Sequence, residues 1–94
     1  MVKNFINNFG KKYKNLIIKN TKFTNNELLK KSVLDIGTGN GTYVYSLSPY
    51  VKSIYGIDNN KKILDKARKR NRIFKYKNIR FYNKSLPNLL FKRN

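Results

Sequence analysis

The chain lacks cysteine and histidine entirely, and it has no tryptophan. Without cysteine, neither a disulfide framework nor a thiolate metal site is available, and without histidine a zinc site is not expected. We therefore predict that no metal takes part in its chemistry. No apolar run is long enough for a membrane span or a signal peptide, so we expect a soluble protein of the cytoplasm.

Acidic residues are also scarce, with 4 against 22 lysines and arginines, which gives a formal net charge of +18. The usual partner of such a charge is a polyanion, so weak, salt-sensitive contact with RNA or DNA through Lys and Arg is one interpretation. Lysine greatly outnumbers arginine, however, and Asn, Ile, Tyr and Phe are abundant, as an AT-rich coding sequence would produce without any binding role. Arginine also recognises phosphates and bases better than lysine does. Both interpretations stay open.

Three of the few glycines stand at alternating positions in one stretch, V-L-D-I-G-T-G-N-G, at residues 33–41. The apolar run before Gly37 predicts a buried strand, and Val44 and Leu47 follow the glycines at helical spacing. Glycine suits the turn between strand and helix because it reaches unusual φ angles and lets a ligand approach the bare backbone. Such a strand, glycine turn and helix N-terminus form the ligand site of open α/β sheets.

The spacing of the glycines narrows the choice of ligand. A dinucleotide site has the pattern G-x-G-x-x-G, and Thr42 occupies the third glycine position here. A phosphate-binding P-loop needs Gly-Lys-Ser/Thr after the turn, and none follows. The pattern that fits is D-x-G-x-G-x-G, beginning at Asp35. At this point the chain resembles the class I S-adenosylmethionine-dependent methyltransferases.

The resemblance continues over most of the chain. Residues 53–58, S-I-Y-G-I-D, look like a second strand ending in an acid, where a carboxylate can accept both ribose hydroxyls of an adenosine. The helix after this acid is very similar to that of the methyltransferases. A third strand follows at residues 79–83, and Leu86, Pro87 and Phe91 resemble the loop after it in the small-molecule-type branch of the family.

The resemblance implies an α/β, Rossmann-like methyltransferase fold, truncated here to about three parallel strands with flanking helices. We divide the chain into an amino-terminal helical segment, residues 1–32, and the amino-terminal half of a cofactor-binding domain, residues 33–94. A chain this short buries only about 60–65% of its unfolded surface, so we expect a marginal core.

The resemblance also implies a site for S-adenosyl-L-methionine. The backbone of the turn glycines would lie against the methionine part, Asp35 would help to hold its amino group, and Asp58 would take the ribose hydroxyls. Ile57 and Asn59 would flank the adenine. Many relatives bind the adenine amino group with an acid after strand three, whereas this chain has Ser85 at the matching position. The candidate cofactor-binding residues are Asp35, Gly37, Gly39, Gly41, Ile57, Asp58, Asn59 and Ser85.

Apolar residues recur at helical spacing over residues 2–17, among lysines, and predict an amphipathic helix. Such a helix packs on the sheet or lies on an anionic membrane, and we favour packing. Gly10 interrupts it at a cost of about 1 kcal/mol relative to alanine. In the family, leading helices cover the cofactor cleft, which would put Tyr13 at its mouth. Thr24 and Glu27 have the form of a capping box.

The densest basic run covers residues 61–77. Ile63, Leu64 and Ala67 share one helical face, so burial of that face leaves most of the charges toward water. A solvated outer helix face is the interpretation we favour. The alternative is an RNA backbone footprint, which would need these charges on the same side as the cofactor cleft.

Relatives continue into a fourth strand, whose end carries residues that face the methyl acceptor, and this chain reaches Asn94 before any such strand. We therefore expect the amino-terminal part of a methyltransferase domain, with no catalytic residue identified. The strand at 33–36 then becomes an edge that needs a second chain or further sequence to cover it. Three hypotheses follow: a methyltransferase of unidentified acceptor, a non-catalytic basic nucleic-acid-binding module on the same fold, and a decayed remnant.

Overall fold

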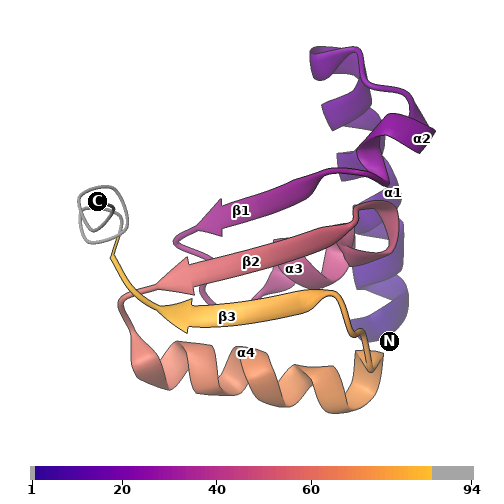
Figure 1. Ribbon diagram of the computed structural model, residues 1–94. Coiled ribbons are helices and arrows are strands. Elements are labelled where there is room, and N and C mark those ends of the chain that lie inside the picture. The colour runs from indigo at the N-terminus through magenta and orange to yellow at the C-terminus, as the bar shows by residue number, and fades with distance from the viewer. Residues whose placement is uncertain (1, 86–94) are drawn as a thin grey trace, which may run out of the picture.

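The computed structural model describes residues 2–85, and its elements follow the predicted order (Figure 1). In chain order they are α1 (Val2–Thr21), α2 (Asn25–Leu28), β1 (Ser32–Ile36), α3 (Thr42–Leu47), the 3-10 turn η1 (Ser48–Tyr50), β2 (Ser53–Asp58), α4 (Lys61–Phe74) and β3 (Ile79–Asn83). The strands expected at residues 53–58 and 79–83 have those bounds. The predicted loop residues Leu86, Pro87 and Phe91 lie outside the described residues.

The three strands form one parallel sheet in the order β1-β2-β3, with β1 at an edge among the described strands. Along one row of the sheet, Ile36 lies beside Ile57, which lies beside Tyr82. Because all three strands run the same way, their carboxyl ends meet at one side of the sheet, on the left in Figure 1. This arrangement confirms the expected α/β architecture of three parallel strands with flanking helices.

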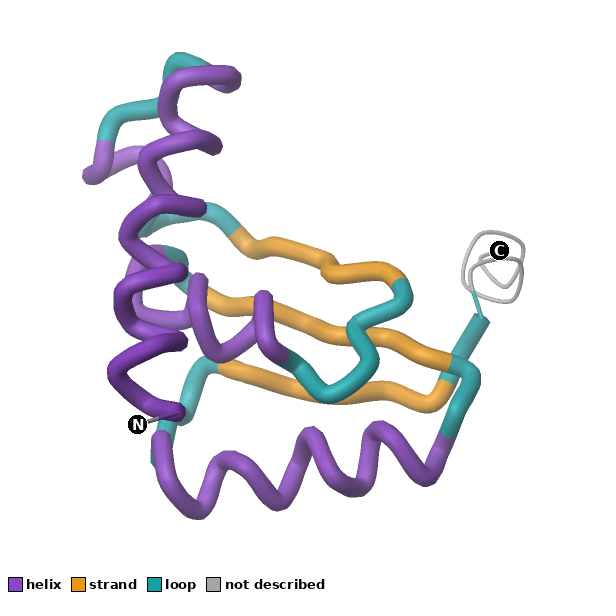
Figure 2. Tube along the Cα trace, turned by 180° about the vertical axis from the view of Figure 1, so that it is seen from behind, coloured by secondary structure: helices purple, strands orange, loops and turns teal. Residues whose placement is uncertain are grey.

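The core lies between the sheet and the helices that connect its strands. Helices α3 and α4 lie on the same side of the sheet (Figure 2), and their side chains pack with those of the strands in one core. Tyr45 of α3 stacks on Phe74 of α4 at a centroid distance of 4.6 Å, and both are almost fully buried. On this face, the fully buried side chains from the connecting helices and β2 include Val44, Tyr45, Ser46, Ile54, Leu64 and Ala67. These contacts fix the helices against the sheet.

A capping box stabilises the N-terminus of the short helix α2, as predicted. The Thr24 backbone amide donates to the Glu27 carboxylate at 3.0 Å, and the Glu27 amide donates to the Thr24 hydroxyl at 3.1 Å. The bonds from Thr24 hold the pKa of Glu27 below its usual value. The chain then turns into β1, where the Lys31 carbonyl accepts from the Lys52 amide at 2.9 Å and so ties the start of β1 to that of β2.

Gly10 lies buried in the middle of α1, at the contact between α1 and α3. A Cβ added there would lie 2.3 Å from the Ser46 carbonyl oxygen, a backbone atom that cannot move alone. Ile6, four residues earlier on the same helix, is also buried. The glycine therefore lets the axes of α1 and α3 approach closely, which explains why a poor helix former is placed here.

The opposite face of the sheet has no helix over it among residues 2–85. Leu34 and Ile36 of β1 expose 44% and 52% of their surface there, and Tyr82 of β3 exposes 42%. Next to them is a mostly apolar hollow of about 440 Å³, lined by Ser32, Val33, Leu34, Tyr55, Ile57, Tyr82 and Lys84. In the described part of the chain, no helix is both long and apolar enough to cross a membrane.

Substitution of Gly10 by alanine tests the contact between α1 and α3. Helix propensity alone would stabilise the variant by about 1 kcal/mol. We expect instead a net loss of about 1–3 kcal/mol in the free energy of unfolding, because the new methyl group overlaps the Ser46 carbonyl. Thermal unfolding followed by far-ultraviolet circular dichroism measures the difference. Asn15→Ala, at an exposed site of the same helix, is the control and should be neutral or slightly stabilising.

Substitution of Leu34 by lysine tests the open face and the edge strand. An exposed apolar edge promotes pairing between copies, so we expect Leu34→Lys to reduce self-association and to change stability by no more than about 0.5 kcal/mol. Sedimentation velocity over a concentration series measures the association. Ile73→Lys adds the same charge at a 58% exposed position on α4. An equal reduction in both variants would mean that charge alone, and not this face, governs association.

Candidate cofactor site

The glycine turn after β1 leaves open space beside its backbone. Gly37 and Gly39 have φ angles of 71° and 58°, and a Cβ added to either would meet no atom within 4 Å. The turn needs their positive φ, and their missing side chains leave a bare backbone surface that a ligand can reach. Gly41, also at positive φ, is buried, and its Cβ would lie 3.0 Å from the Phe81 ring. Gly41 therefore serves the packing of α3 more than the open surface.

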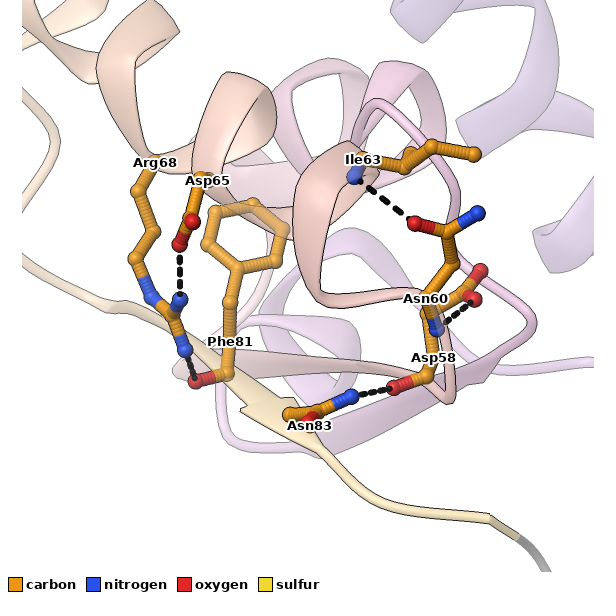
Figure 3. A network of polar contacts seen from close by, with 7 residues as sticks. All are labelled: Asp58, Asn60, Ile63, Asp65, Arg68, Phe81 and Asn83. Atoms are coloured by element: carbon orange, nitrogen blue, oxygen red, sulfur yellow. Dashed lines mark hydrogen bonds and ion pairs between the residues drawn. The ribbon is translucent and has the colours of Figure 1, made fainter.

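Asp58 joins this turn to the end of β2. Its Oδ2 accepts from the Gly39 amide at 2.9 Å, and its Oδ1 accepts from the Asn60 amide at 2.9 Å. Figure 3 shows the Asn60 side of this arrangement. Each carboxylate oxygen can accept more than one hydrogen bond, so two amides orient the group and leave acceptor capacity for a ligand. The carboxylate thus lies between two loops that parallel strands bring together.

The neighbouring strand and helix brace the end of β2 (Figure 3). The Asn83 side-chain amide donates to the Asp58 carbonyl at 3.0 Å, which ties β3 to β2 at their last pair. The Asn60 side chain caps α4 by accepting from the Ile63 amide at 3.1 Å. On α4, Arg68 forms an ion pair with Asp65 at 3.0 Å and also donates to the Phe81 carbonyl at 2.9 Å. The position of Asp58 is therefore fixed from several elements.

A pocket of about 270 Å³ opens at the carboxyl ends of the three strands. It is lined by Ile36, Gly37, Ile57, Asp58, Asn59, Lys84 and Ser85. Five of the eight candidates meet here, from three segments that are far apart in the sequence. Asp35, Gly39 and Gly41 do not line this pocket. Gly39 contacts it through its bond to Asp58, whereas Asp35 lies on the other face of β1, toward the helices.

Asp35 is half-buried, and one of its carboxylate oxygens has no polar partner among the described residues. Its Oδ2 and the Thr38 hydroxyl are both buried, and neither makes a hydrogen bond with any group in the described part of the chain. Burial raises the pKa of Asp35, while the nearby Thr38 hydroxyl acts in the opposite direction. A buried carboxylate oxygen without a partner is costly, and a ligand cation or donor placed against it would remove that cost.

Gly56 of β2 makes room for Thr38. A Cβ added to Gly56 would lie 2.7 Å from the Thr38 hydroxyl oxygen and 2.9 Å from its Cβ. Gly56 also pairs with Asp35 across the sheet. Thr38, Gly56 and Ile36 belong to the site but were not among the residues selected from the sequence. Thr38 could have been selected from the sequence because it lies inside the glycine pattern. Gly56 could not, because no local sequence pattern marks it as a site residue.

Tyr13 of α1 lies within electrostatic range of Asp35, on the helical side of the sheet. Burial raises the pKa of Tyr13 above its usual value, and the Tyr43 phenol and the Asp35 carboxylate add to the effect. The rings of Tyr13 and Tyr43 meet edge to face at a centroid distance of 4.8 Å. The leading helix thus approaches Asp35 through Tyr13, although Tyr13 does not line the pocket beside Asp58.

Solved structures of known proteins share this architecture. YcgJ from Bacillus subtilis is 30% identical with a TM-score of 0.63, covering 76% of this chain and 29% of that protein. An S-adenosylmethionine-dependent methyltransferase from Clostridium acetobutylicum is 26% identical with a TM-score of 0.64, covering 84% of this chain and 30% of that protein. A dimethyladenosine transferase from Plasmodium falciparum is 27% identical with a TM-score of 0.61, covering 74% of this chain and 24% of that protein. The chain therefore spans less than a third of the length of these relatives.

A search of curated proteins found no match. The sequence profile of a family described as "Methyltransferase domain" matches residues 29–94, which include the glycine turn, all three strands and α4. The Rossmann-like fold and the order of the motifs agree with that match. On this basis the chain belongs to the methyltransferase domain family.

Proposed function

We propose that this chain is the cofactor-binding half of an S-adenosylmethionine-dependent methyltransferase whose methyl acceptor is unidentified. The observation that carries the proposal is the Asp58 carboxylate, which two backbone amides hold at 2.9 Å beside a pocket formed at the ends of three parallel strands. Such an edge is where open α/β sheets bind ligands. The family match supports the reaction class.

The residues present suit the parts of S-adenosyl-L-methionine. Asp58 would accept the ribose hydroxyls, and Ile57, Asn59 and Ser85 would surround the adenine in the same pocket. The open space beside Gly37 and Gly39 would take the chain of the methionine part. The buried Oδ2 of Asp35, without a partner among the described residues, would receive its cationic amino group. Ser85 is a departure from the resemblance, because many relatives have an acid at the matching position.

The chain's own contribution would be binding and orientation. When bound, S-adenosyl-L-methionine supplies an activated methyl group, which passes to a nucleophile in line with the sulfur that leaves. Asp58 would fix the ribose end of the cofactor, and the glycine turn and Asp35 would fix its methionine end, which holds the methyl group in one direction. Every candidate residue is assigned to binding the cofactor. None is therefore assigned as a general acid or base toward the methyl acceptor.

We propose further that another polypeptide segment, in the same or a second chain, covers β1 and supplies the acceptor site. Three observations support this. Among the described strands β1 lies at an edge of the sheet, Leu34 and Ile36 are exposed beside an apolar hollow, and the solved relatives are more than three times as long as the matched region. We therefore expect this chain alone to bind the cofactor without transferring a methyl group.

Calorimetric titration with S-adenosylhomocysteine at moderate salt tests the cofactor site. We expect saturable binding, and a loss of about tenfold or more in affinity for Asp58→Asn and Asp58→Ala, because each removes a charged acceptor of ligand hydroxyls. The control is Asp65→Asn, which removes the same charge from the exposed ion pair with Arg68 and should leave binding unchanged. If the folded chain does not bind, the proposal is wrong, and the basic nucleic-acid-binding module or the decayed remnant is favoured.

Asp35→Asn should separate stability from binding. Because burial raises the pKa of Asp35 in the folded chain, the folded state holds more protons than the unfolded state between the two pKa values. The Asp35 contribution to stability therefore falls as the pH rises through that window. We expect Asp35→Asn to raise the melting temperature at neutral pH, with a gain that shrinks toward acidic pH, and to weaken S-adenosylhomocysteine binding. Thermal unfolding across this pH range measures the first effect, and a melting temperature lowered at neutral pH would contradict it.

A further inference from the structure

A ladder of four aromatic rings runs along α1 and onto α3, and we call Phe5, Phe9, Tyr13 and Tyr43 the ring ladder. Successive centroids on α1 are 6.4 Å apart from Phe5 to Phe9 and 5.9 Å apart from Phe9 to Tyr13, with interplanar angles of 9° and 19°. Tyr43 meets Phe9 and Tyr13 edge to face at 5.3 and 4.8 Å. The α1 rings therefore present nearly parallel planes.

Both ends of the ring ladder face solvent. Phe5 is 65% exposed and Tyr43 is 42% exposed, while Phe9 and Tyr13 are half-buried. Large exposed apolar groups that touch one another are uncommon on a soluble domain and mark a surface for interaction. Ile6 and Gly10 make the fully buried contacts of α1, and Tyr13 also packs against the core, so core packing does not account for the exposure of Phe5 and Tyr43.

The charged residues of α1, which carries three rings of the ladder, are all basic. Helix α1 contains Lys3, Lys11, Lys12, Lys14 and Lys19 and no acidic residue. Lys12 follows Phe9 by three positions and Phe5 by seven, so it shares their side of the helix. Three of the four acids of the chain are engaged elsewhere: Glu27 in its cap, Asp58 with two amides, and Asp65 with Arg68. The fourth, Asp35, lies within electrostatic range of Tyr13 on α1. The ligand that this combination fits is an anionic polymer that also carries flat rings.

We propose that the ring ladder is a binding surface for single-stranded RNA. Aromatic side chains next to cations bind single strands by stacking on the bases while the cations follow the phosphates. Asparagine also recurs on α1, with Asn8 three positions after Phe5, and its amide can donate to and accept from bases and ribose hydroxyls. The ring ladder contains none of the residues assigned to the cofactor, although Tyr13 lies near Asp35. The proposal therefore stands independently of the proposed function.

Two polyanions separate base stacking from simple charge attraction. The full chain without cofactor is titrated into a fluorescent 12-nucleotide oligoadenylate, and a polyphosphate of equal charge but without bases is used as a competitor. We expect Phe5→Leu and Tyr43→Leu each to weaken RNA binding about fivefold or more, because each variant loses the stacking of one base on a ring. Competition by polyphosphate should not change, and neither should the slope of affinity against salt, because no cation is removed.

The controls keep the test specific to this surface. Tyr82→Leu removes a ring that is also 42% exposed, but on the open face of the sheet, and it should leave RNA binding unchanged. Asp58→Asn should leave RNA binding unchanged, which separates this proposal from the cofactor site. Circular dichroism verifies folding, and Phe5→Leu, at the most exposed ring, should not disturb it. Unchanged RNA affinity in both ladder variants, or an equal loss in Tyr82→Leu or toward polyphosphate, would overturn the proposal.

Discussion

The hydrogen bond from the Gly39 amide to the Asp58 carboxylate is the constraint on which the candidate site depends. It joins the turn after β1 to the end of β2, two segments that come together only because the strands are parallel and adjacent. Since the Asn60 amide holds the other oxygen, the carboxylate cannot turn away from the pocket without losing a bond. The sheet, the glycine turn and the cap of α4 therefore all serve to position one charge, in a chain with 4 acidic residues.

The two faces of the sheet are unequal. The helical face is closed by the connecting helices and by α1, whose approach to α3 relies on Gly10. On the other face Leu34, Ile36 and Tyr82 remain exposed, and β1 has a strand on one side only among residues 2–85. Such a sheet buries little apolar area for its size, and the core is correspondingly small. The matched region covers only 29% of one solved relative and 30% of another.

The basic residues on α4 and those on α1 have different surroundings. On α4 it lies on an exposed outer helix face, where Arg68 pairs with Asp65 and braces β3, so some of the cations have structural roles. On α1 the lysines accompany exposed aromatic rings, and that combination is informative in a way that net charge alone is not. A biased coding sequence explains many lysines, but it does not explain why four aromatic rings should contact one another across two helices.

The sequence by itself determined the strands, the glycine turn and the acid at the end of β2, because periodicity and glycine spacing are local properties of the chain. It also determined the capping box of Thr24 and Glu27, whose partners are three residues apart. Only the tertiary structure decided that Gly56 makes room for Thr38 and that Gly10 meets the Ser46 carbonyl. It alone brought Ser85 beside Asp58 and Tyr13 beside Tyr43. These contacts join residues that are distant in sequence, and their geometry follows from how helices and strands pack rather than from any local pattern.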